Sequence, residues 1–126
     1  MQDNSKKLKT DVRIRSYQFA LTVIKFLDGL NKNDWSVQVI AKQLLRSATS
    51  IGANIIEAQA GSSKRDFTNY FSHALKSANE TKFWLGLLRD SGKSNYEKAD
   101  ELLQEAIQIA NILGSSILTL KGKSNF

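Results

Sequence analysis

The sequence predicts an all-α protein, an up-down-up-down four-helix bundle. Its 126 residues include no proline and only seven glycines, so the composition favours neither a linker nor a sheet of short strands. Four stretches repeat apolar residues every three or four positions, which is the spacing along one face of an α-helix. Only a few residues separate these stretches, and short connections make consecutive helices lie antiparallel. A chain of this length forms one domain.

Residues 1–10 are polar and basic and have no helical repeat, so we expect a disordered basic tail before the first helix. The first helix is expected at about 11–31, and Gly29 with the polar residues after it supplies the stop. Its apolar inner row consists of Val12, Phe19, Val23, Phe26 and Leu30.

The second helix is expected at about 35–60, with Asp34 or Ser36 as its N-cap and Gly61 directly after its last residue. Small or polar side chains such as Ser47 interrupt the flanks of its apolar row. Small side chains there allow another helix to approach closely.

The third helix is expected at about 64–90, capped by Ser62 or Ser63, and a Ser-Gly-Lys-Ser turn follows it. The fourth helix is expected at about 95–121, and residues 122–126 form a C-terminal tail. The bundle therefore spans residues 11–121.

Two helices carry a second apolar row on the side away from the core. These oligomer-interface candidates are Ile14, Tyr17, Leu21 and Ile24 on the first helix, and Phe83 and Leu87 on the third. A single bundle would leave both rows in water, and contiguous apolar patches on a protein surface usually mark an interface. The sequence therefore predicts self-association into a homo-oligomer, and a closed cyclic ring would cover the rows without forming fibres.

The basic residues gather at one end of the predicted bundle. The chain has 18 Lys and Arg against 12 Asp and Glu, a net charge of +6. The N-terminal tail, the turn between the second and third helices and the C-terminal tail share one end, which holds that whole net charge. The nucleic-acid-binding candidates at this end are Lys6, Lys7, Lys9, Arg13, Arg15, Lys64, Arg65, Lys121 and Lys123. The alternative is that these lysines only improve solubility.

No set of residues in the sequence specifies a reaction. There is no cysteine and a single histidine, His73, which excludes a thiolate metal site and a histidine cluster. The Glu-x-x-His motifs of a four-helix diiron site are also missing. We therefore predict no catalytic activity, no cofactor and no metal. A structural polar network at helix or subunit contacts is the interpretation of Arg46, Asn54, Glu57 and Glu80.

Two further expectations concern aromatic residues and location. Trp35 and Trp84 are interpreted as packing anchors rather than platforms for stacked bases, because apolar residues flank both at helical spacing. No apolar run approaches the ~20 residues that cross a bilayer, and the N-terminus lacks the apolar segment of a signal peptide. We expect a cytoplasmic protein with no membrane partner.

The middle of the chain carries a family resemblance. Gln43–Glu57 reads QLLRSATSIGANIIE, Phe67 and Phe71 begin the third helix, and Ala74–Glu80 reads ALKSANE. Over about residues 12–120 this pattern resembles the four-helix bundle proteins encoded within 23S rRNA intervening sequences. The departures, none of which disturbs the helical repeat, are Ser47 for Ala, Ala58 for Gly, Lys76 for Gly and the lack of a proline in the first turn.

The resemblance implies a cyclic homopentamer of four-helix subunits with no established catalytic activity. Some relatives are accessory factors of diversity-generating retroelements, in which such a bundle binds reverse transcriptase and nucleic acid. Combined with the basic end, this predicts a ring that binds RNA or another polyanion through phosphates, with little reading of bases. The alternatives are a protein-interaction scaffold or accessory factor without direct nucleic-acid binding, and a small-ligand site along the ring axis.

Overall fold

Four long α-helices make up the protein. This computed structural model describes the backbone of residues 4–124 and the side chains of residues 12–122. The helices are α1 (Asn4–Asp28), α2 (Trp35–Ala60), α3 (Lys64–Asp90) and α4 (Tyr96–Ser124). No strand occurs between residues 4 and 124. The predicted all-α class with four helices is confirmed.

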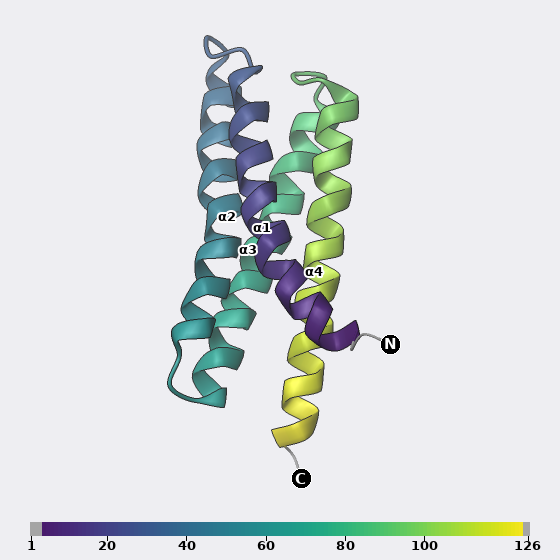
Figure 1. The fold of residues 1–126 in the computed structure, drawn as a ribbon. Coiled ribbons are helices and arrows are strands. Elements are labelled where there is room, and N and C mark those ends of the chain that lie inside the picture. Colours follow the sequence, from purple (N-terminus) through teal and green to yellow (C-terminus); the bar gives the residue numbers. More distant parts are fainter. Residues whose placement is uncertain (1–3, 125–126) are drawn as a thin grey trace.

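The helices lie side by side with short turns at their ends. Figure 1 shows the α1–α2 and α3–α4 turns at one end of the molecule and the α2–α3 turn at the other. Within the set, α3 packs most extensively, against α2 and against α4. In contrast, α1 packs less closely on α2 and α4, and Figure 1 shows it crossing from the α4 side to the α2 side.

The helix bounds match the sequence prediction in the middle of the chain and differ at its ends. The second and third helices have the predicted bounds, whereas α1 begins at Asn4 and ends at Asp28, and α4 continues to Ser124. The polar segment predicted as a tail thus joins α1, since it has no Pro or Gly and its Lys and Leu residues favour a helix. Residues 1–3 and 125–126, also predicted as tail, lie outside the described residues.

Side chains at the helix starts fix the two turns next to α2, and one glycine forms the third turn. The Asp34 carboxylate accepts a hydrogen bond from the Val37 amide at 3.2 Å, and the Ser63 hydroxyl accepts one from the Asp66 amide at 3.1 Å. Each satisfies an amide that has no partner inside its helix. Gly92, in the α3–α4 turn, has a φ of 74°, which other residues rarely adopt.

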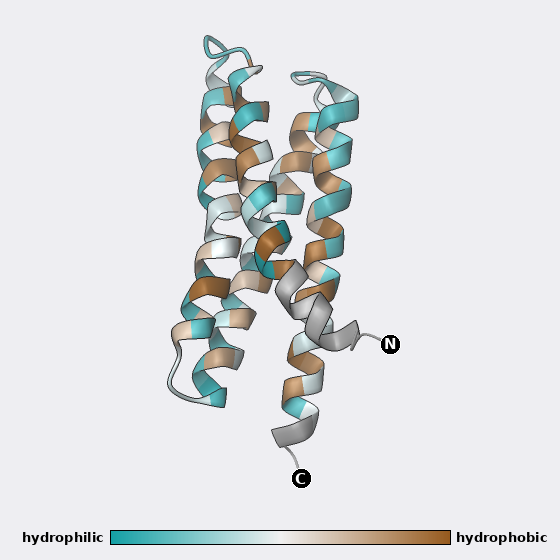
Figure 2. Cartoon of the chain, viewed as in Figure 1, coloured by the Kyte–Doolittle hydropathy of each residue, from teal (hydrophilic) through white to brown (hydrophobic). Residues whose placement is uncertain are grey.

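The predicted inner rows form a continuous core. Hydrophobic residues recur along all four helices in Figure 2, and the inner row predicted for α1 is buried throughout. The other helices contribute fully buried side chains, among them Leu44, Ile51, Phe71 and Leu113. Among the small residues of α2, Gly52 meets Ser16 of α1: a methyl group added at Gly52 would be in ordinary contact with the Ser16 hydroxyl oxygen, at 3.5 Å.

Candidate functional site

The end of the bundle at the α2–α3 turn carries a basic hollow, which we define by the residues that line it. It has a volume of about 430 Å³ and lies between the first turns of α3 and the last turns of α4. The residues are Lys64, Arg65, Thr68, Asn69 and Lys121. Three of the nine predicted nucleic-acid-binding residues therefore meet at one place, and all three are exposed.

The local sequence explains why the basic hollow is open and positive. Gly61 ends α2, and Ser63 caps the start of α3. Lys64 and Arg65 therefore lie on the first turn of α3, where both are exposed. The Thr68 hydroxyl donates back to the Lys64 carbonyl at 2.9 Å, so it is engaged within the helix. The Asp66 carboxylate is held by the Ser62 hydroxyl at 3.3 Å and is not among the residues that line the hollow.

Two other predicted basic residues have side chains that are described on α1, and their surroundings differ from the basic hollow. Arg13 is exposed. Arg15 is half-buried, and its guanidinium contacts the Glu105 carboxylate of α4 through both oxygens, at 2.6 and 3.0 Å. Arg15 also donates to the Gln108 side chain at 2.8 Å. Its charge is thus used to hold α1 against α4. The side chains of Lys6, Lys7, Lys9 and Lys123 lie outside the described residues.

Both predicted outer apolar rows are exposed in the single chain. On α1, Ile14, Tyr17, Leu21 and Ile24 have exposed fractions of 43 to 64%, and on α3 Phe83 and Leu87 are also exposed. The Phe83 ring meets Trp84 edge to face, with 5.0 Å between the ring centres. The interpretation of Trp35 as a packing anchor is wrong, because the first residue of α2 has few neighbours and this side chain is 75% exposed. Trp84 does pack against the core.

The predicted polar network is only partly assembled. Arg46 on α2 forms an ion pair with Glu80 on α3 and also donates to Gln43 at 3.2 Å. Glu80 accepts a second hydrogen bond from the indole N–H of Trp84 at 3.0 Å. Asn54 instead donates to the Ser50 carbonyl and hydroxyl of its own helix, and Glu57 is exposed. The network therefore divides into a cross-helix pair and two separate residues.

A chain of hydroxyl groups between α2 and α3 was not anticipated from the sequence. The Thr81 hydroxyl oxygen lies 2.8 Å from the Ser47 hydroxyl and 2.7 Å from the Ser77 carbonyl, and the Ser77 hydroxyl donates to Ser50 at 3.0 Å. Ser47 and Thr81 are completely buried. The spacing of four between Ser77 and Thr81 was the available signal, since it places both on one side of α3.

The described residues form neither a metal site nor a membrane span. No group of three His, Cys, Asp or Glu side chains in that part of the chain is placed to hold a metal ion. No helix there is long and apolar enough to span a membrane.

Comparison with known proteins decides the family. A family model described as 23S rRNA-intervening sequence protein matches residues 8–115, which is most of the chain. The chain belongs to the 23S rRNA-intervening sequence protein family. The predicted family resemblance is thereby confirmed.

A solved structure agrees with this membership. The chain is 36% identical to a protein with unknown function from the S23 ribosomal protein family of Bacteroides thetaiotaomicron, known from a crystal structure at 1.70 Å resolution. The match covers 87% of this chain and 97% of the other, with a TM-score of 0.80. No curated protein matches the chain.

Proposed function

We propose that this chain is a non-enzymatic up-down-up-down bundle that assembles into a cyclic homo-oligomer and binds RNA or another nucleic acid at its basic end. One observation carries the proposal: Lys64, Arg65 and Lys121 line one hollow, and no carboxylate is among the residues that line it. Membership in a family described by its link to 23S rRNA is compatible with an RNA partner.

The chemistry of the basic hollow suits a phosphate group. An arginine can donate two parallel hydrogen bonds to phosphate oxygens, and lysines add compact positive charges. The amide of Asn69 offers a further donor at the edge. No aromatic side chain lines the hollow, so it provides no platform on which a base could stack. We therefore expect contacts to the backbone and little dependence on nucleotide sequence.

Assembly would multiply this weak site. Cyclic symmetry points every subunit the same way along the ring axis, so all copies of the basic hollow would lie on one face. The exposed rows on α1 and α3 support an interface between subunits, and the family resemblance implies five of them. Several linked weak contacts to one RNA give a high overall affinity.

The test is a salt titration of RNA binding, followed by fluorescence anisotropy with a labelled structured RNA. The logarithm of the affinity should fall linearly with the logarithm of salt concentration. Replacing Lys64, Arg65 and Lys121 together by Gln should weaken binding and reduce the slope by up to ~0.9 for each phosphate that is no longer neutralised. Gel filtration with light scattering should show an unchanged oligomer.

A matched control removes the same charge elsewhere. Lys32, Lys42 and Lys76 are exposed and lie outside the basic hollow. Replacing these three lysines together by Gln should leave the RNA affinity within about twofold of that of the unaltered protein. The change removes only long-range attraction, which salt screens. Equal weakening by both triple variants, or no RNA binding at about 50 mM salt, would contradict the proposal.

The second candidate function is a protein-interaction scaffold or accessory factor without direct nucleic-acid binding. The exposure of Trp35 and of the apolar row on α1 favours it, since docking can use these side chains. Such docking depends on buried apolar area and should change little with salt. This second function would be supported if the chain did not bind RNA and retained a protein partner in high salt.

A further inference from the structure

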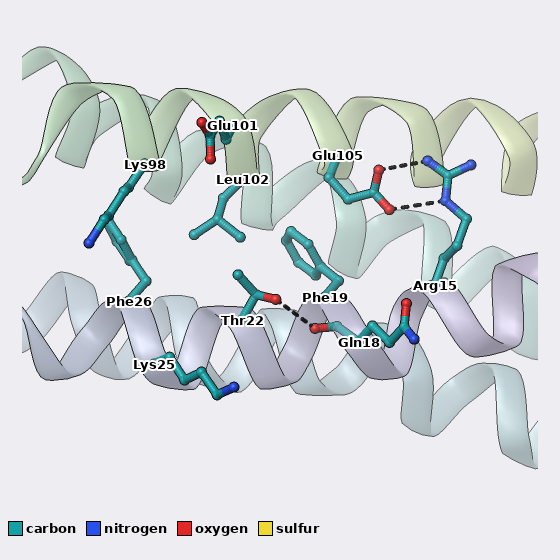
Figure 3. A pocket seen from close by; sticks show the side chains of 10 residues that line it. All are labelled: Arg15, Gln18, Phe19, Thr22, Lys25, Phe26, Lys98, Glu101, Leu102 and Glu105. Carbon is teal, nitrogen blue, oxygen red and sulfur yellow. Dashed lines mark hydrogen bonds and ion pairs between the residues drawn. The ribbon is translucent and has the colours of Figure 1, made fainter.

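A second concave site lies between α1 and α4, well separated in sequence from the lining of the basic hollow. This α1–α4 groove has a volume of about 500 Å³ (Figure 3), a size typical of sites for small organic ligands between helices. Phe19, Phe26 and Leu102 form its floor and are at most 9% exposed. The groove exists because α1 packs less extensively on its neighbours than α3 does.

One end of the α1–α4 groove is closed by a charge pair. Figure 3 shows Arg15 reaching across to Glu105, whose two carboxylate oxygens it contacts at 2.6 and 3.0 Å. Two bonds in parallel satisfy this carboxylate and offset its charge. This end therefore presents a neutral, occupied pair to a ligand.

The other end keeps unbalanced positive charge. Lys25 on α1 and Lys98 on α4 are exposed, and neither ammonium group forms an ion pair within the part of the chain whose side chains are described. Glu101, one turn from Lys98, is the remaining acidic residue in the lining, so the two lysines outweigh it. Their flexible stems also extend the apolar walls, as long charged side chains commonly do.

We propose that the α1–α4 groove binds an organic anion with a slender apolar body, of the class of medium-chain carboxylates. The carboxylate would lie beside Lys98, and the flexible Lys25 side chain, which Figure 3 shows extending away from α4, would turn toward it; the alkyl chain would run over the floor toward the Arg15–Glu105 pair. From Lys98 to Glu105 the groove follows α4 for about 10 Å at 1.5 Å per residue.

The experiment compares octanoate with octanol by isothermal titration calorimetry on the intact assembled protein. Octanoate should bind at one molecule per subunit and more tightly than octanol, which has the chain without the charge. Replacing Lys25 and Lys98 together by Gln should weaken octanoate binding about tenfold, since it removes two charge-assisted hydrogen bonds, and leave octanol unchanged. The matched control, Lys42→Gln with Lys76→Gln on α2 and α3, should change neither.

A second variant, which fills the groove, tests the location of the ligand independently of the two lysines. Thr22 is exposed in the lining, and its hydroxyl donates to the Gln18 carbonyl at 2.9 Å within α1. Thr22→Phe should fill the groove without disturbing the core and abolish binding of both compounds, with helical content and oligomer size unchanged. Equal affinity for octanoate and octanol, full binding by Thr22→Phe, or fewer than one molecule per subunit would each overturn the proposal. RNA binding is a separate measurement and does not enter this one.

Discussion

Replacing Thr81 by Val tests the hydroxyl pair that joins α2 to α3 inside the core. Thr81 is completely buried, and its hydroxyl oxygen lies 2.8 Å from the Ser47 hydroxyl and 2.7 Å from the Ser77 carbonyl. Valine has nearly the same shape, so the change removes the hydrogen bonds without opening a large cavity. The effect on stability should therefore report the hydrogen bonds themselves.

The expected destabilisation follows from what remains after the substitution. One intramolecular hydrogen bond contributes about 1 kcal/mol net, and a buried polar group left poorly paired costs about 1 kcal/mol or more in addition. The Ser77 carbonyl can still accept the main-chain bond of α3. Ser47 keeps only the Leu44 carbonyl, at a long 3.3 Å. We expect Thr81→Val to lower the free energy of unfolding by about 1 to 2 kcal/mol.

A double-mutant cycle separates this hydrogen bond from general packing effects. Ser47→Ala alone should cost about 1 kcal/mol, because it removes the same bond from the other side. The double variant has neither hydroxyl and leaves no orphaned partner, so its destabilisation should be close to that of one single variant. The coupling energy between the two positions should therefore be about 1 kcal/mol.

Urea unfolding at one fixed protein concentration measures these differences, because the assembly we propose would make apparent stability depend on concentration. Thr49→Val is the matched control: Thr49 is exposed on α2, and its hydroxyl donates to the Leu45 carbonyl at 2.7 Å. It should change stability by less than about 0.5 kcal/mol. Additive effects in the cycle, or equal effects of Thr49→Val and Thr81→Val, would refute the reasoning.

Two further predictions concern assembly and acid stability. Leu21→Glu should dissociate the proposed oligomer, because a charge in an apolar interface has no partner. Light scattering should then show smaller particles while circular dichroism still shows helices, and an unchanged particle size would argue against α1 as the interface. The pKa of Asp34 is lowered from 3.8 to about 2. The largest cause is the Lys93 ammonium, 3.0 Å from the Asp34 carboxylate, followed by hydrogen bonds from Ser36 and from the Val37 amide. The lowered pKa of Asp34 adds stability above pH 3.8, and this stability disappears as the pH falls toward 2. Lys93→Gln should therefore destabilise the protein at pH 6 but not near pH 2. Carbon NMR should show that the substitution raises the pKa of Asp34.

Helical periodicity was sufficient to predict most of the fold. The inner rows and the bounds of α2 and α3 follow from apolar spacing and from caps such as Asp34 and Ser63. The start of α1 at Asn4 could not be predicted, because apolar spacing begins only near residue 11. The polar segment before it contains no Pro or Gly that would stop a helix, so α1 continues through it toward the N-terminus. Trp35 shows a second limit: an aromatic at the first helical position matches the repeat yet has few neighbours to cover it.

The candidate site was harder to predict, because partners depend on which helices meet. Lys64, Arg65 and Lys121 share one hollow as the antiparallel order of short-turn helices suggests. Arg15 was grouped with them by position along the chain, but the side of α1 that carries it meets Glu105 on α4. The α1–α4 groove could not be predicted from the spacing of apolar residues, because its lining has the same residue types as any half-buried helix face.

The loose packing of α1 would link folding to the proposed assembly. The helix α1 contacts α2 at two small residues, Ser16 on α1 and Gly52 on α2. On its other side, the α1–α4 groove separates α1 from part of α4. Burying the outer row of α1 in a ring would stabilise that helix further, at about 25 cal/mol for each Å² of apolar surface removed from water. Dissociating the ring with Leu21→Glu should therefore speed amide hydrogen exchange in the middle of α1 more than in the middle of α3. Unchanged exchange in α1 after dissociation would mean that α1 is held by the bundle alone and that its exposed row has another use.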